Sequence, residues 1–170
     1  NGKLKYIGYF ENNKPIGKFK RYYENGNLKA EIEYNNKNNY THAIFYYENG
    51  KKAAEGFYND KNKDSTWKYY SYDKESVIAE ENYHNGKLNG LSIRYYLNGK
   101  PFEKISWKEN KKNGIWEQYF DNGALRLQGF YKNDTLNGPF YAYFENGYIQ
   151  VKGFFKDGKR HGKWEYYNDY

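Results

Sequence analysis

The sequence predicts an all-β fold, an elongated single-layer antiparallel sheet of repeated β-hairpins. The first observation behind this is a column of seven aromatic residues that recur at intervals of 24, 24, 25, 24, 24 and 24. The column consists of Phe10, Tyr34, Tyr58, Tyr83, Trp107, Tyr131 and Phe155. A period in this range is typical of repeat arrays, whose single units cannot bury an apolar face alone. We therefore expect one repeat domain over residues 1–170, with six to seven units that are partial at both ends.

The second observation is an alternation of apolar and polar residues before each column residue. Leu28, Ala30 and Ile32 alternate with charged residues up to Tyr34, and the same pattern follows Asn122-Gly123 and Asn146-Gly147. Period-two alternation predicts a half-buried strand, and no segment shows a sustained helical period. The column residues should therefore lie on the buried face of the sheet.

The third observation is a pair of alternating turn signals. Asn-Gly occurs at 25–26, 49–50, 98–99, 122–123 and 146–147. This dipeptide predicts type I′ hairpin turns, in which both central residues have positive φ. Second turns are expected at 35–37, 59–61, 85–87, 109–111, 133–135 and 157–159. A glycine often opens the strand after them, where positive φ or a flat-packed ring would require it. These glycines are Gly17, Gly90, Gly114, Gly138 and Gly162.

The first strand of each unit carries an aromatic doublet. The doublets are Tyr22-Tyr23, Tyr46-Tyr47, Tyr69-Tyr70, Tyr95-Tyr96, Tyr119-Phe120, Tyr143-Phe144 and Tyr166-Tyr167. Neighbouring strand residues point to opposite faces, so we expect one member of each doublet to be buried. Phe19 and Trp116 share strand parity with the second member of the doublet that follows them, which favours burial of the second member. Trp67 and Trp164 do not share parity with the second members of their doublets. Residues 71–76 replace an Asn-Gly turn, which predicts a bulge or a longer loop.

Composition excludes several classes of protein. Aromatic residues make up 22 % of the chain although the mean hydropathy is −1.26, so we expect a folded protein with an aromatic core rather than a disordered chain. The chain has no Cys, which excludes disulfides, thiolate metal sites and Cys nucleophiles. Its net charge is +7, and excess Lys on a flat sheet usually guards against edge pairing.

Residues 153–167 read Gly-Phe-Phe-Lys-Asp-Gly-Lys-Arg-His-Gly-Lys-Trp-Glu-Tyr-Tyr. This segment resembles the MORN repeat (membrane occupation and recognition nexus), and more closely its bacterial variant. Similar spacing recurs at 112–123, 129–147, 8–26 and 83–99, whereas residues 38–76 depart from it. The resemblance implies an elongated sheet of successive hairpins that binds proteins or phospholipid headgroups or serves as a scaffold. Many bacterial members are secreted or lipid-anchored, and many are labelled antitoxins.

Nothing in the sequence predicts catalysis, a metal or a cofactor. The three histidines, His42, His84 and His161, lie in different units at or near turns. No paired metal ligands, nucleophile elbow or phosphate loop is present. We expect no catalytic residues, no metal ligands and no enzyme activity.

A binding surface is the better hypothesis. Four aromatic residues precede column residues and have the opposite parity: Tyr9, Phe57, Phe130 and Phe154. They could form an exposed stripe, or they could only pack on neighbouring side chains and stiffen the sheet.

We expect a module for protein–protein interaction, scaffolding or self-association, acting through the sheet face or an open edge strand. The alternative is an anionic membrane or a cell-wall glycan bound by a basic aromatic face. Nucleic acid is disfavoured, because acidic residues are interspersed among the basic ones. Asn1 stands where an initiator Met would be expected. A cleaved leader would indicate an extracytoplasmic location and a shortened chain would not, so a cytoplasmic location stays open.

Overall fold

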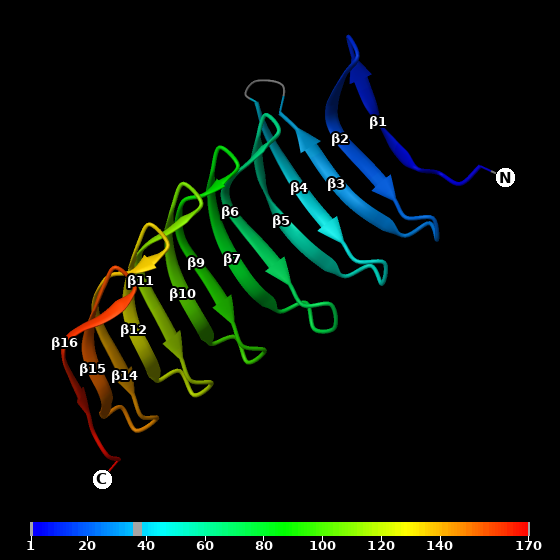
Figure 1. The fold of residues 1–170 in the computed structure, drawn as a ribbon. Coiled ribbons are helices and arrows are strands. Elements are labelled where there is room, and N and C mark those ends of the chain that lie inside the picture. Colours follow the sequence, from blue (N-terminus) through cyan, green and yellow to red (C-terminus); the bar gives the residue numbers. More distant parts are fainter. Residues whose placement is uncertain (1, 36–38, 170) are drawn as a thin grey trace. The chain divides into compact units, whose positions relative to one another are not determined.

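The computed structural model describes residues 2–35 and 39–169. The chain divides into two compact units, Asn1–Lys87 and Leu88–Tyr170, and each is described by itself. The strands of the first unit are β1 (Tyr6–Glu11), β2 (Lys14–Tyr22), β3 (Leu28–Tyr34), β4 (Tyr40–Tyr46), β5 (Lys52–Asn59), β6 (Asn62–Tyr70) and β7 (Val77–His84). Each pairs antiparallel with the next one along the chain, as the consecutive hairpins of Figure 1 show.

The second unit repeats this plan. After β8 (Lys87–Leu88), at the boundary, come β9 (Gly90–Tyr95), β10 (Pro101–Lys108), β11 (Lys111–Tyr119), β12 (Leu125–Lys132), β13 (Thr135–Leu136), β14 (Gly138–Tyr143), β15 (Ile149–Lys156) and β16 (Lys159–Tyr166). The order β9-β10-β11-β12-β14-β15-β16 follows the sequence, and β13 pairs with β12. The structure thus confirms the predicted all-β fold of successive antiparallel hairpins.

The register separates two faces of each sheet. We call the core face the one that carries Phe19, Trp67 and the aromatic column, and the polar face the one that carries Lys20, Glu31 and Glu55. On the core face, most column residues lie opposite a small residue of the paired strand, as Tyr34 does opposite Gly17 and Tyr131 opposite Gly114. Six of the seven column residues are half-buried. Phe10 is 56 % exposed, so the expected burial is wrong there, because β1 has a described neighbour only on its β2 side.

The core is built from rings that lie flat on glycines of the preceding strand. A Cβ added at Gly8 would overlap the Phe19 ring, and one added at Gly56 would overlap the Trp67 ring. Trp67 is 1 % exposed; its indole N–H donates to the Phe57 carbonyl at 2.9 Å, and the Tyr58 ring packs edge-on at 4.9 Å. In the second unit, the Trp164 ring covers Gly153 in the same way. These ring–glycine pairs are the main packing units of the sheet.

The glycines that open strands after the second turns have positive φ, which is one of the two explanations that the sequence suggested for them. Gly17, Gly90, Gly114, Gly138 and Gly162 have φ between 61° and 132°. In the first unit Ser65 takes the corresponding place, four residues after Lys61 of the Asp60-Lys61 turn, with φ of 60°. This non-glycine residue in the left-handed region marks β6 as strained relative to the other repeats.

The Asn-Gly turns are not type I′ turns, so that prediction is wrong. Only the glycine has positive φ, and the bonds Gly26 N–Tyr23 O and Tyr23 N–Asn27 O enclose a three-residue loop. This is a type I turn followed by a left-handed residue that forms a bulge. The asparagine instead links neighbouring repeats, because the side-chain amides of Asn49, Asn98 and Asn122 donate hydrogen bonds to the corresponding loop of the next repeat.

Two adjacent residues with positive φ, which a type I′ turn needs, occur instead in the second set of turns. Examples are Asn85-Gly86, Glu109-Asn110 and Asp157-Gly158. The turn expected at 35–37 lies largely outside the described residues. The longer loop expected at 71–76 is present, closed by a hydrogen bond from Ser71 N to Ser76 O at 2.9 Å.

The doublets do not divide into a buried and an exposed member, because both members are half-buried in all but the last. The second member bonds to the next repeat instead: the Tyr23, Tyr47 and Tyr96 hydroxyls donate to the Tyr46, Tyr70 and Tyr119 carbonyls at 2.7–2.8 Å. Register also explains the broken parity of Trp67 and Trp164. Tyr70 and Tyr167 are the second members of their doublets, but they occupy the strand position that the first member has in the other repeats. These two doublets therefore begin one residue earlier in the strand than the others.

We predict that Gly56→Ala destabilises the protein by roughly 1–3 kcal/mol, because the new methyl group would overlap the Trp67 ring. Urea unfolding followed by tryptophan fluorescence measures the change. Gly2→Ala is the matched control, since its new Cβ would meet nothing within 4 Å. Equal stability of the two variants would contradict the ring–glycine packing.

Candidate functional site

The polar face of the first unit carries a row of charges that crosses the strands. Lys20, Glu31, Ile44, Glu55, Lys68 and Glu80 are successive register partners from β2 to β7. Two neighbouring pairs form ion pairs, Lys20–Glu31 at 3.1 Å and Lys68–Glu80 at 3.9 Å. Each is partly exposed and screened by solvent, so it contributes little to the free energy of unfolding. The row therefore shapes the surface more than it stabilises the fold.

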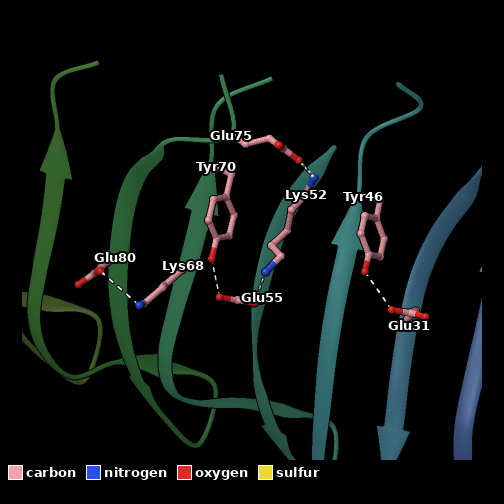
Figure 2. A network of polar contacts seen from close by, with 8 residues as sticks. All are labelled: Glu31, Tyr46, Lys52, Glu55, Lys68, Tyr70, Glu75 and Glu80. Carbon is pink, nitrogen blue, oxygen red and sulfur yellow. Dashed lines mark hydrogen bonds and ion pairs between the residues drawn. The ribbon is translucent and has the colours of Figure 1, made fainter. Parts of the chain in front are cut away.

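Tyrosine hydroxyls hold two of these carboxylates in place, as Figure 2 shows. The Tyr46 hydroxyl donates to Glu31 at 2.9 Å, and the Tyr70 hydroxyl donates to Glu55. Lys52 also bonds to Glu55, at 2.8 Å. Burial and the bond to Glu31 raise the pKa of Tyr46 to about 12, so this tyrosine stays neutral and donating at physiological pH. The hydrogen bonds from Lys20 and Tyr46 lower the pKa of Glu31, which therefore stays ionised.

The next row of the same face holds an aromatic pair. The His42 ring on β4 packs against the Phe57 ring on β5, with centroids 4.8 Å apart and planes 33° apart. Phe57 is 42 % exposed. Ile44 follows two residues after His42 and thus lies on the same face. We call His42, Ile44 and Phe57 the His42 patch.

Three shallow hollows border the His42 patch. Their volumes are about 270, 490 and 420 Å³, and His42 lines all three. Glu31 and Glu33 on β3 and Glu55 on β5 lie directly beside β4, whereas the lysines of these hollows stand one strand further out, on β2 and β6. The patch is thus apolar at its centre and has an acidic inner rim.

A buried carboxylate lies at one end of β6. Asp64 is 6 % exposed and accepts hydrogen bonds from the Tyr40 hydroxyl at 3.0 Å and from the Asn85 amide N–H at 3.3 Å. His84 Nδ1 lies 3.3 Å from Asp64 Oδ1, the oxygen that also accepts from the Asn85 N–H. The Ser65 hydroxyl also donates to Asp64, at 3.4 Å. The cluster anchors the Asn85-Gly86 turn.

Asn113 has the same role in the second unit. Its side-chain oxygen accepts from the Asn133 amide N–H at 3.4 Å, again at a turn. The Asp64 cluster is therefore part of the repeat structure. Among residues 2–35 and 39–169, no group of three His, Cys, Asp or Glu side chains could hold a metal ion. The same residues contain no helix that is long and apolar enough to cross a membrane.

The structure places the four predicted binding residues on different strands. Tyr9 on β1 is 75 % exposed, and β2, β3 and β4 separate it from Phe57. In the second unit, Phe154 is 41 % exposed and lies opposite Pro139, whereas Phe130 is half-buried and lies opposite Ile115. Within the first unit, Tyr9 and Phe57 therefore do not adjoin each other. Of the four, only Phe57 borders the hollows around His42.

Sequence reasoning missed His42 and Ile44 as surface residues. They lie in the irregular segment 38–76, where the repeat pattern is weakest. The available signal was their shared parity with each other, which places both on one face of a strand. Their proximity to Phe57 depends on the β4–β5 register, in which His42 lies opposite Phe57.

We predict that Asp64 makes folding sensitive to acid. Burial favours the neutral form of Asp64, but the hydrogen bonds from Tyr40 and Asn85 and the nearby His84 outweigh it and lower its pKa. A lowered folded-state pKa contributes stability above the unfolded pKa of about 3.9, and this is lost as the pH falls through the folded value.

Asp64→Asn should therefore cost about 1–3 kcal/mol at pH 7, and its stability should change less than that of the wild type below about pH 4. Urea unfolding at a series of pH values measures both effects. Asp73→Asn, on an exposed loop, is the control and should follow the wild type. Parallel pH profiles of Asp64→Asn and the wild type would contradict the prediction.

Comparison with known proteins identifies the repeat. A family model described as MORN repeat variant matches residues 15–36, 42–60, 88–109, 112–133 and 136–157, together more than half of the chain. No curated protein matches the chain.

Among solved structures, a crystal structure of TarM matches at 16 % identity and a TM-score of 0.40, covering 59 % of this chain and 20 % of that one. A crystal structure of a mutant of S. aureus TarM in complex with fondaparinux, α-GlcNAc-glycerol and UDP matches at 13 % identity and a TM-score of 0.35, covering 78 % and 21 %. The chain thus spans about a fifth of the length of these proteins, and the likeness carries no argument about function.

Proposed function

The chain belongs to the MORN repeat variant family, whose repeats are generally protein- or membrane-binding modules, and we propose that it is a non-enzymatic module that binds a protein partner through the His42 patch. The observation that carries this proposal is the exposed His42–Phe57 ring pair beside three hollows. Aromatic side chains beside pockets are typical of the residues that dominate binding energy in protein interfaces.

The surroundings of the patch favour a rigid, preformed site. β3, β4 and β5 are each paired on both sides, so their backbones cannot rearrange without breaking the sheet. Tyr46 and Tyr70 hold the carboxylates of Glu31 and Glu55 in fixed positions. A preformed site loses less conformational entropy on binding than a flexible one.

The charge pattern indicates the chemistry of the partner. Lys20 already pairs with Glu31 and Lys52 with Glu55. Glu33 is therefore the carboxylate beside β4 that would attract Lys or Arg, and the hollows beside Phe57 would accept an apolar side chain. The partner should thus present an apolar residue next to a basic one. Recognition would use side chains, because the paired strands of this face leave no free backbone for strand addition.

Selection from a phage-displayed random peptide library tests this proposal directly. The wild-type protein should enrich peptides that combine an apolar residue with neighbouring Lys or Arg. Amide chemical shifts on adding an enriched peptide should change most at His42, Ile44 and Phe57. Absence of any enriched motif, or shift changes confined to other strands, would refute the proposal.

We predict that Phe57→Ala weakens binding of an enriched peptide at least tenfold, or about 1.4 kcal/mol, because it removes the ring on which His42 packs. Isothermal titration calorimetry measures the affinity. Phe154→Ala is the matched control, since that ring is 41 % exposed and also precedes a column residue. Equal weakening by both variants would place binding elsewhere.

The alternative function is binding of an anionic membrane or a cell-wall polymer, which the net charge of +7 supports. Co-sedimentation with phosphatidylglycerol vesicles, compared with phosphatidylcholine vesicles, distinguishes it from protein binding. Electrostatic binding should weaken steeply with added salt. Equal numbers of lysine and glutamate side chains line the hollows around His42, so the His42 patch offers no excess positive charge to such a surface.

A further inference from the structure

One strand of the first unit lacks the large ring that the ring–glycine packing needs. In most repeats, the residue two positions after the positive-φ residue that opens the first strand is Phe or Trp, and it lies on the core face. These residues are Phe19, Trp67, Trp116, Phe140 and Trp164. β4 carries Ala43 at this place and β9 carries Ser92. Ala43 has no ring to lie over the preceding strand, β3, and β3 accordingly has Ile32 where β1 has Gly8 and β5 has Gly56.

The missing ring divides the aromatic core of the first unit into two clusters. Phe19 contacts Tyr6, Phe10 and Tyr34, with centroids 5.4–6.3 Å apart. Trp67 contacts Phe45 and Tyr58, at 6.2 and 4.9 Å. Between these clusters, above β3, lies a trough of about 870 Å³ on the core face. This volume falls within the range of small-molecule sites.

The lining of the trough combines rings with polar groups. Tyr34, Phe45 and Tyr58 supply aromatic surface, and Arg21 stands at the β2 side. Asn12, Asn39 and Lys61 also line the trough. The register neighbours of Arg21 are Tyr6 and Ala30, and the ion pairs found among the described residues do not include it. The guanidinium is thus available to a ligand.

The strands under the trough disfavour an extended peptide as its ligand. β2, β3 and β4 are each hydrogen-bonded to two neighbouring strands, so their backbone groups are already paired. An extended peptide in the trough would have to leave its own N–H and C=O groups without backbone partners. A saccharide needs only apolar surface for its ring faces and side-chain polar groups for its hydroxyls.

We propose that this trough binds an acidic oligosaccharide, with sugar rings on Tyr34, Phe45 and Tyr58 and an acidic group on Arg21. The planar guanidinium matches a carboxylate in a bidentate geometry. Lys14, Arg21 and Lys61 outnumber Glu11 and Asp60 in the lining, which favours an anionic ligand over a neutral one. The trough lies on the face opposite the His42 patch, so this site goes beyond the proposed protein-binding function.

A printed array of acidic and neutral oligosaccharides, probed with the full chain, is the first test. Acidic members should be retained in preference to neutral ones of the same length. Calorimetry with tetragalacturonic acid and with maltotetraose then compares a carboxylated and an uncharged tetrasaccharide in solution. Retention of no acidic member, or equal affinity for the two tetrasaccharides, would overturn the proposal.

Two charge-matched variants locate the site. Arg21→Gln should weaken binding of the retained acidic oligosaccharide at least tenfold, whereas Lys18→Gln, on the same strand but bordering a polar-face hollow, should change it less than twofold. Both variants remove one exposed positive charge, so an equal loss would show non-specific attraction and refute the trough.

Phe57→Ala separates the two proposals. It should weaken peptide binding at least tenfold and leave oligosaccharide binding unchanged. Loss of oligosaccharide binding in this variant would place the ligand on the polar face and overturn the assignment to the trough.

Discussion

The packing of an aromatic ring flat on a glycine of the preceding strand is the interaction on which each unit depends. A single-layer sheet has no second layer to cover it, so its large side chains must lie along the sheet surface. Gly8 and Gly56 allow Phe19 and Trp67 to do this, because any side chain there would occupy the space of the ring. The result is a core in which Trp67 is 1 % exposed although the sequence is strongly hydrophilic.

A positive charge completes this packing from the outer side of the rings. The Lys63 ammonium lies 4.5 Å from the Trp67 ring centroid and about 5 Å from those of Tyr69 and Tyr83. Burial lowers the pKa of Lys63. In the second unit, Lys112 lies over the Tyr131 ring at 5.0 Å and Arg160 over the Trp164 ring at 4.7 Å. Part of the basic excess therefore covers the core and is not offered to an anionic partner.

Both candidate sites of the first unit come from the same irregular strand. β4 places Thr41 and Ala43 on the core face, where their small size leaves the trough above β3. It places His42 and Ile44 on the polar face, where they form a patch with Phe57. One strand that departs from the repeat thus changes both surfaces at once, because neighbouring residues point to opposite faces. The regular repeats stiffen the sheet, and the departure from regularity is where we place binding.

The sequence by itself determined the repeat, the strands and the positions of the turns, since these follow from local periodicity and from the φ preferences of glycine and asparagine. It also placed the aromatic column and Phe57 on opposite faces of the sheet, because the alternation of side chains along a strand is a local property. Only the tertiary structure decided that the Asn-Gly loops have three residues, that the Tyr69-Tyr70 doublet is displaced and that His42 faces Phe57. These features depend on register, and register is set by bulges and by cross-strand packing of residues far apart in the chain.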